Sequence, residues 1–200
     1  AAMGCGDIEA GSLSFSASNC HAYFDGYPVH EVYKAYGMLE DEMKLYNVHS
    51  NKQVLLQFRN GLSMLLGRKP IDWDEIEHYG DTDRSITESD EVLDEKDIRY
   101  PFIYGCSLRI LICMLFSKFE LAELLCKKMQ QRVNLNQDPA YELQTNIYMY
   151  IGLASAGMYR QTKRNKHLQS LRKLKKTFVN FCKTKGKSCT NRALILRAEL

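Results

Sequence analysis

Apolar residues recur every three or four positions along most of this chain, and that spacing predicts helices. The clearest case is residues 101–133, where PFIYGCSLRILICMLF is followed by the short turn SKFE and by LAELLCKKMQQRV. The pattern predicts two helices folded back on each other. Their facing sides would carry Phe102, Cys106, Ile110, Cys113 and Phe116 on the first helix, and Leu121, Leu124, Leu125, Cys126 and Met129 on the second. Arg109 interrupts the apolar run, and we expect it to reach the rim of the pair.

The same spacing predicts three helices before this pair. The first covers residues 2–24, where small side chains would allow close contact with a neighbouring helix. The second covers residues 28–46, and its buried face would be Val32, Tyr36, Leu39, Met43 and Tyr46. The third is capped by Ser50 or Asn51 and stops at Gly67, and its buried face would be Val54, Leu55, Phe58, Leu62, Leu65 and Leu66.

Two further helices follow the central pair. One starts at Asp138 and Pro139 and is apolar nearly all round, which is typical of a buried helix. Gly152 and Gly157 would let its neighbours approach closely. The next is a basic helix over about residues 164–183, with an apolar stripe made of Leu168, Leu171, Leu174, Phe178 and Phe181.

Ser188 or Thr190 would cap a last helix, and no segment shows the alternation of a strand, so we predict an all-α fold. The helices recur as antiparallel pairs at intervals resembling tetratricopeptide (TPR) units of about 34 residues, although the strict repeat signature is absent. We therefore predict a TPR-like α-solenoid. A single helical repeat-like domain would span the chain, with the first helices in residues 1–67, an acidic connection in 68–98 and further helix pairs in 99–200.

The acidic connection has a different character from the rest of the chain. It is rich in Asp, Glu, Ser and Thr and has few apolar residues. We predict a long connection with short helices near residues 72–79 and 88–96. Connections of this length inside a compact domain are uncommon and are either functional or partly mobile.

Composition narrows the class of protein. With 200 residues and 45% hydrophobic content, the chain can bury a sizeable core, and a net charge of +3 gives no global reason to expect nucleic acid or a membrane as partner. The most apolar window, residues 103–116, is shorter than the roughly 20 residues of a membrane span, and no signal peptide is visible. Seven cysteines without a CxxC pair favour reduced core thiols, so we expect an intracellular, cytoplasmic protein.

Three short motifs resemble metal or phosphate sites but fail on spacing. The Gly-Lys-Ser of residues 186–188 copies the end of a phosphate-binding loop, but Phe181 stands where that loop needs glycine. His30 begins like a zinc-protease helix, but Lys34 occupies the position of the second ligand. An Asp-x-Asp-x-Ser run begins like a calcium loop, but Ile86 replaces the glycine of its sharp turn.

The cysteines give no better candidate. Cys20 and His21 are adjacent, so a helix would point their side chains about 100° apart. Cys106 and Cys113 share a helical face, where packing is favoured over metal binding. We therefore predict no catalytic residue, no cofactor and no metal site, and we do not expect this segment to be an enzyme.

The basic helix is the strongest candidate for a binding surface. No Asp or Glu occurs in residues 160–197, and a dense cationic face beside an apolar stripe suits an acidic groove, a phosphate backbone or an anionic membrane surface. The candidate partner-binding residues are Lys163, Arg164, Lys166, Arg172, Lys173, Lys175, Lys176 and Lys183. The alternative is a solvated outer face, or one covered by the acidic segment 72–97. Reversing Lys173, Lys175 and Lys176 to Glu should weaken binding to an acidic partner.

Several stretches resemble one family of very large signalling proteins. GDIEAGSLSFSASNCHAYFDGYPVHEV resembles the "GD-E-A…Y…G" helix pair in the helical middle region of those proteins, and YPFIYGCSLRILICMLFSKFELAELLCKKMQ is similar to the TPR-like pair that follows. The end of the chain, ALILRAEL, is similar to the "…LVEAEL" phrase of that region. Members carry an AAA/STAND-type ATPase, with serine/threonine-kinase-like and GAF plus histidine-kinase modules elsewhere in the polypeptide.

The resemblance implies a protein-interaction or regulatory scaffold segment of a signal-transduction ATPase/kinase, with no catalysis of its own. Its partner would be another protein or other domains of the same polypeptide. The chain lacks an initiator Met and stops inside an apparent helix, so we expect a piece of a longer protein. The alternative is a self-standing basic helical module that binds RNA or an acidic protein through residues 163–187. We expect no membrane span.

Overall fold

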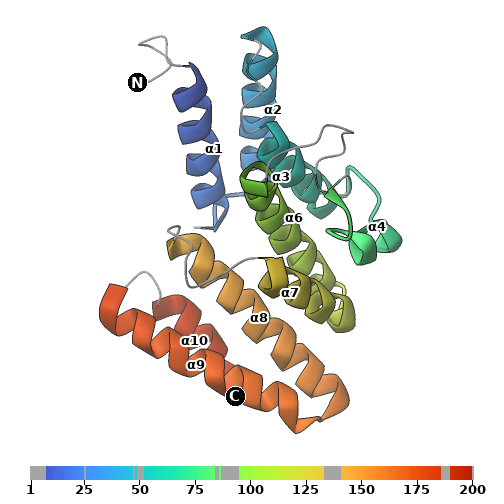
Figure 1. Cartoon of the computed structure of the whole chain (residues 1–200), viewed down its shortest axis with the longest axis vertical. Coiled ribbons are helices and arrows are strands. Elements are labelled where there is room, and N and C mark those ends of the chain that lie inside the picture. The colour runs from blue at the N-terminus through green and yellow to red at the C-terminus, as the bar shows by residue number, and fades with distance from the viewer. Residues whose placement is uncertain are drawn as a thin grey trace. The chain divides into compact units, whose positions relative to one another are not determined.

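The computed structural model describes residues 8–24, 26–46, 48, 52–83, 86, 95–132, 141–185 and 190–199. Its elements are α1 (Ile8–Phe24), α2 (Val29–Leu45), α3 (Lys52–Leu65), α4 (Trp73–His78), α6 (Glu95–Leu115), α7 (Phe119–Arg132), α8 (Tyr141–Thr162), α9 (Asn165–Lys185) and α10 (Thr190–Ala198), as Figure 1 shows. Each of these elements is a helix, and the described residues include no strand, which confirms the all-α prediction. The solenoid arrangement stays a prediction.

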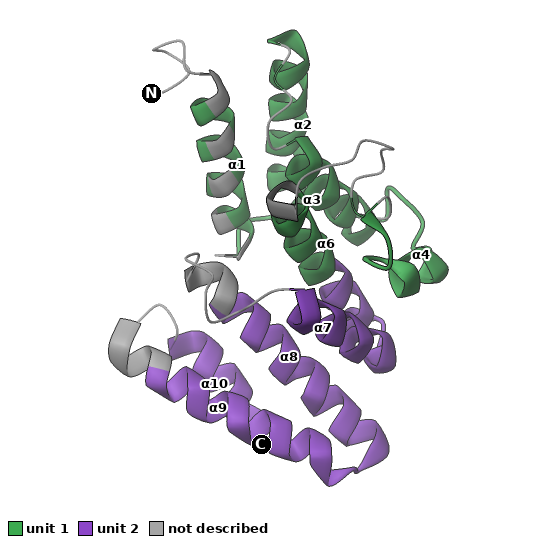
Figure 2. Ribbon diagram, viewed as in Figure 1, with its two compact units in different colours: residues 1–108 green, residues 109–200 purple. Residues whose placement is uncertain are grey.

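The chain divides into two compact units, residues 1–108 and 109–200, with the boundary inside α6 (Figure 2). Unit 1 contains α1 to α4 and most of α6. Unit 2 contains the end of α6 and α7 to α10. The prediction of one repeat-like domain over residues 1–200 stays a prediction.

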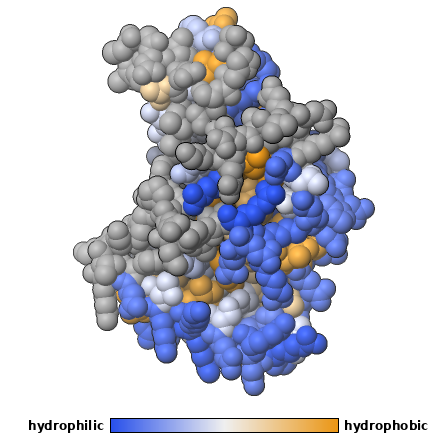
Figure 3. Space-filling view, viewed as in Figure 1, coloured by the Kyte–Doolittle hydropathy of each residue, from blue (hydrophilic) through white to orange (hydrophobic). Residues whose placement is uncertain are grey.

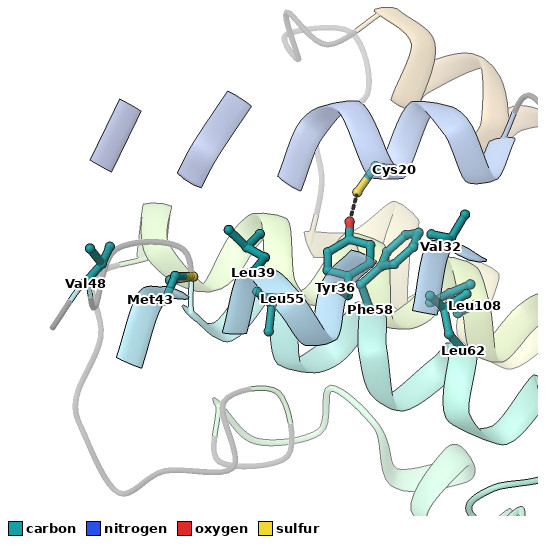
Figure 4. Close-up of a cluster of buried hydrophobic side chains, with 10 residues drawn as sticks. All are labelled: Cys20, Val32, Tyr36, Leu39, Met43, Val48, Leu55, Phe58, Leu62 and Leu108. Atoms are coloured by element: carbon teal, nitrogen blue, oxygen red, sulfur yellow. Dashed lines mark hydrogen bonds between the residues drawn. The ribbon is translucent and has the colours of Figure 1, made fainter. Parts of the chain in front are cut away.

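Consecutive helices of unit 1 pack on one another, α1 on α2 and α2 on α3. The core between them joins Cys20 of α1, four residues of α2, three of α3 and Leu108 of α6 (Figure 4). The predicted faces are confirmed for most positions, since α2 buries Val32, Tyr36, Leu39 and Met43, and α3 buries Val54, Leu55, Phe58 and Leu62. Leu65 and Leu66 are only half-buried. Tyr46 was predicted wrongly, because it lies just past the end of α2 and is 54% exposed.

Aromatic rings fill the centre of this core. The Phe58 ring lies 5.5 Å from that of Tyr23, 5.0 Å from Tyr36 and 5.8 Å from Tyr104, measured between centroids. The Tyr36 hydroxyl donates to the Ser16 carbonyl at 3.0 Å and lies 2.8 Å from Cys20 Sγ. Because the hydroxyl has one hydrogen, the Cys20 thiol is the donor of the second bond.

The short helix α4 confirms the first of the two helices predicted in the acidic connection. Asp72 caps it, and its carboxylate accepts from the backbone N–H groups of Asp74 at 3.0 Å and Glu75 at 3.1 Å. Most of the second predicted helix, residues 88–96, lies outside the described residues. After α4 the chain docks on α6 through Tyr79, whose ring stacks on Phe102 and whose hydroxyl donates to the Pro101 carbonyl at 3.2 Å.

The prediction that the central helix pair starts at residue 101 is wrong. Proline usually interrupts a helix, but α6 begins at Glu95 and continues through Pro101. Its residues on both sides of the proline, Ile98 and Phe102, are buried. This burial supports the helix across the missing backbone N–H, so tertiary packing outweighs the local preference.

Arg109 and Phe116 are also corrections. Arg109 does not reach a rim but is 1% exposed, because the middle of α6 is buried on nearly all sides. Phe116 does not share the buried face, because α6 ends at Leu115 and Phe116 lies in the following turn. The facing helix α7 buries Leu125, Cys126 and Met129, whereas Leu121 and Leu124 are half-buried.

Two glycines of α8 allow close contacts between helices in unit 2. A side chain at Gly157 of α8 would overlap the Phe119 ring of α7, and one at Gly152 would overlap Leu196 of α10. The prediction that these glycines permit close packing is therefore confirmed. The long helix α8 also packs on α9. One core cluster joins Ala156 of α8, Leu171 and Phe178 of α9, and Leu196 of α10.

Candidate functional site

The apolar stripe of α9 divides this helix into a buried and an exposed face. Leu171, Leu174 and Phe178 are buried toward α8 and α10, and Leu168 is half-buried. The Phe181 side chain lies outside the described residues. A hydrogen bond of 3.2 Å between the hydroxyls of Ser155 and Ser170 adds a polar contact between α8 and α9. The predicted stripe therefore orients the helix, and the remaining positions face outward.

Most of the predicted partner-binding residues lie on this outer face. Lys166, Arg172, Lys173 and Lys176 of α9 are exposed, as are Lys163 and Arg164 in the turn before it. Lys175 is half-buried, and the Lys183 side chain lies outside the described residues. Hydrophilic side chains cover most of the described part of unit 2 in the view of Figure 3.

The α9 face carries positive charge without local compensation. Residues 165–185 include no Asp or Glu, so no carboxylate on the same helix can pair with these side chains. A face of this kind can hold phosphate or carboxylate groups from a partner. Whether the acidic segment 72–97 covers it stays a prediction, and several described acidic groups of that segment have local roles. Asp72 caps α4, Glu75 pairs with Lys69 at 3.3 Å, and Asp81 pairs with His78 at 3.1 Å.

A buried histidine lies at the edge of this surface, and sequence patterns gave no sign of it. His167 Nδ1 is 3.7 Å from a Glu123 carboxylate oxygen, and its Nε2 has no hydrogen-bond partner within the described residues. Burial lowers the pKa of His167, the Glu123 carboxylate opposes this shift, and Lys166, Lys127 and Arg164 add to it. The lowered pKa favours the neutral imidazole at neutral pH.

Unit 1 has a second polar cluster that the sequence did not indicate. The guanidinium groups of Arg59 and Arg68 lie 5.3 and 4.6 Å from the ring centroid of Tyr33, which are cation–π distances. Arg59 also pairs with Glu40, which in turn pairs with Lys44 at 2.7 Å. Although desolvation would raise the pKa of Tyr33, the two guanidinium groups lower it.

The described cysteines behave as core residues. Cys20, Cys106, Cys113 and Cys126 are buried and form no disulfide, which fits the predicted packing role of Cys106 and Cys113. Burial raises the pKa of Cys20 to about 12, although hydrogen bonding with Tyr36 and Tyr104 acts against the shift, and burial raises the pKa of Cys113 to about 12. A thiol with so high a pKa is a poor nucleophile at neutral pH. Among the described residues no three His, Cys, Asp or Glu side chains form a group that could hold a metal ion.

One described stretch, Ile98–Leu115 of α6, is long and apolar enough to cross a membrane by length and composition alone. It is 67% buried inside the protein, which is also the behaviour of a core helix. Compared with models of known protein families, with curated proteins and with solved structures, the chain has no match.

Proposed function

We propose that this chain is a helical protein-interaction or regulatory scaffold, with no catalysis of its own, within a signal-transduction ATPase/kinase. The observation that carries the proposal is α9, because one face is buried in unit 2 and the opposite face presents Arg172, Lys173 and Lys176 to solvent. A helix with a cationic face and no carboxylate of its own is suited to hold an acidic protein surface. The resemblance of the helix pairs to TPR-like regions of such proteins supports the same assignment.

The proposed scaffold would consist of TPR-like helix pairs. Packing of consecutive helices within each unit, α1 with α2 and α3 in unit 1 and α7 to α10 in unit 2, supports this arrangement. The proposed location is the cytoplasm. The four described cysteines are buried and form no disulfide, which fits a reducing compartment.

The parent protein is tested by the full-length gene. We expect an ATPase domain with a phosphate-binding loop upstream of this segment and a kinase module downstream. A gene that encodes neither domain would overturn the assignment to a signalling ATPase/kinase.

The binding face is tested by charge reversal. Lys173→Glu with Lys176→Glu should weaken binding to a polyglutamate peptide, a surrogate for an acidic protein surface, by about tenfold at low salt. Lys175 is left unchanged because it is half-buried. Lys34→Glu with Lys52→Glu changes the net charge equally at exposed positions of unit 1 and should bind like the unmodified protein. Equal losses in the two variants would indicate a response to net charge alone.

The second candidate function is binding of RNA through residues 163–187, which the same cationic face favours. Single-stranded RNA binding that falls steeply with salt and depends on Lys173 and Lys176 would support it over the scaffold. Binding to polyglutamate without binding to RNA at physiological salt would favour the scaffold.

A further inference from the structure

The turn between α6 and α7 exposes two large apolar side chains. Leu115 is 65% exposed and Phe116 is 57% exposed, although the sequence pattern predicts Phe116 on a buried face. Large apolar side chains that stay exposed side by side are candidates for contact with a partner or a membrane.

Two backbone hydrogen bonds order this turn. The N–H of Lys118 donates to the Cys113 carbonyl at 2.7 Å, and the N–H of Ser117 donates to the Met114 carbonyl at 3.1 Å. Together with the positive φ of Ser117, 57°, this is a Schellman motif at the end of α6. The exposure of Leu115 and Phe116 is therefore built into an ordered turn.

A second turn lies at the same end of unit 2. The antiparallel helices α7 and α8 touch where Phe119, the first residue of α7, packs on Gly157 (Figure 2). From Gly157, α8 runs on for five residues, or about 8 Å, before it ends at Thr162. The turn that follows is also ordered, with the Lys163 N–H donating to the Tyr159 carbonyl at 2.8 Å.

Positive charge surrounds the apolar pair at this end. Lys118, Lys163, Arg164 and Lys166 are exposed in or next to the two turns. Nearby acidic groups are fewer, namely exposed Glu120, the half-buried Glu123 close to Lys127 and His167, and Glu199, which pairs with Arg160.

We propose that this end of unit 2, Leu115 to Lys118 with Lys163 to Lys166, docks on the surface of an anionic lipid membrane. Leu115 and Phe116 enter the interface between headgroups and acyl chains, and the surrounding lysines and arginine contact anionic headgroups. The apolar pair and the cations lie on two turns at one end of unit 2, an arrangement that suits a flat layer better than an extended peptide. RNA would also bind the lysines and the arginine. An exposed leucine, however, adds little to the binding of a phosphate backbone, so the apolar pair favours a membrane.

The test is flotation of the full chain with vesicles of phosphatidylcholine alone or mixed with phosphatidylserine. We expect binding only to the anionic vesicles, and weaker binding as salt rises from about 50 to about 500 mM. Leu115→Ser with Phe116→Ser should lower the affinity by about tenfold or more. Absence of binding to the anionic vesicles, or equal binding to neutral ones, would overturn the proposal.

Unit 1 offers a matched control. Leu45 is 76% exposed beside Tyr46 at the end of α2, where Asp41 and Glu42 are exposed one turn earlier and the adjacent Lys44 is paired with Glu40. Leu45→Ser with Tyr46→Ser therefore removes similar apolar surface from an acidic setting and should bind vesicles like the unmodified chain. If the Leu115 and Phe116 changes leave binding intact, the contact belongs to the α9 face alone and the proposal fails.

Insertion has its own spectroscopic signature. In a Trp73→Phe background, Phe116→Trp makes residue 116 the only tryptophan. Its emission should shift to shorter wavelength when anionic vesicles are added, since the indole leaves water. An unshifted emission despite binding would show that the turn stays outside the lipid. RNA binding that requires Leu115 and Phe116, with no binding to vesicles, would assign the site to RNA and also overturn the proposal.

Discussion

Residues 1–108 and 109–200 build their interiors in different ways. The centre of unit 1 is a set of rings, with Phe58 in contact with Tyr23, Tyr36 and Tyr104. In unit 2 the core cluster of Ala156, Leu171, Phe178 and Leu196 is mostly aliphatic, and α8 contacts α7 and α10 over Gly157 and Gly152. Removing a ring should therefore be most costly at Phe58 of unit 1, and adding a methyl group should be costly at Gly157 of unit 2.

Phe58→Ala should have the largest effect. Phe58 is fully buried, and removing its ring leaves a cavity that costs about 3–5 kcal/mol of unfolding free energy. Urea unfolding monitored by the fluorescence of Trp73, which lies in unit 1, measures this loss. Phe15→Ala is the control, because Phe15 is 40% exposed and its loss should cost about 0.5 kcal/mol or less. A similar cost for both variants would contradict the ring-centred core.

Gly157→Ala tests the opposite property in unit 2. The added methyl group overlaps the Phe119 ring and should destabilise by about 1–3 kcal/mol. The same substitution at Gly37 of α2 meets nothing closer than Arg59 at 3.7 Å and should stabilise by about 0.5–1 kcal/mol through helix propensity. Thermal unfolding by circular dichroism should thus give shifts of opposite sign. Shifts of the same sign would show that the Phe119 ring does not restrict position 157.

Tyr36→Phe probes the polar contact inside the unit 1 core. The change keeps the ring but removes the hydroxyl that joins Cys20 to Ser16, and it should cost about 1 kcal/mol. Tyr46→Phe makes the same change at an exposed position and should leave the midpoint of urea unfolding unchanged. If neither variant differs from the unmodified protein, the buried hydroxyl adds no stability.

The smallest effect concerns pH and unit 2. His167 has a lowered pKa in the folded protein, so the unfolded chain takes up its proton first as the pH falls through about 6.5. The contribution of His167 to the free energy of unfolding is therefore complete above pH 6.5. It is lost as the pH drops toward the lower pKa of His167 in the folded protein. His167→Gln should flatten this part of the profile of unfolding free energy against pH. The hypothesis fails if both profiles have the same slope between pH 7 and 5.

Helical spacing predicted much of the fold because the buried faces repeat with the helix period. Val32, Tyr36 and Leu39 illustrate this for α2, and Leu171, Leu174 and Phe178 do so for α9. The stripe on α9 also indicated where the cationic face lies. Each of these inferences depends only on residues close together in sequence.

The errors arose where distant contacts decide the outcome. Burial on both sides carries α6 through Pro101, and burial of α6 nearly all round encloses Arg109, so neither result is encoded in the local pattern. The exposed Leu115 and Phe116 escaped notice because an apolar run gives no sign of where the helix stops. Their cationic surroundings depend on the approach of Phe119 to Gly157, which joins residues far apart in the chain.

The contact between Tyr79 and α6 couples two positions that lie far apart in the sequence. The Tyr79 hydroxyl fills the space that a methyl group on Gly105 would need, and it bonds the Pro101 carbonyl. The ring carbon Cζ of Tyr79 would also lie 2.5 Å from the added methyl group, so alanine at position 105 fits only with a side chain at position 79 that is smaller than phenylalanine. Among related chains these two positions should vary as a pair, so that covariation between them would report this contact without any structure.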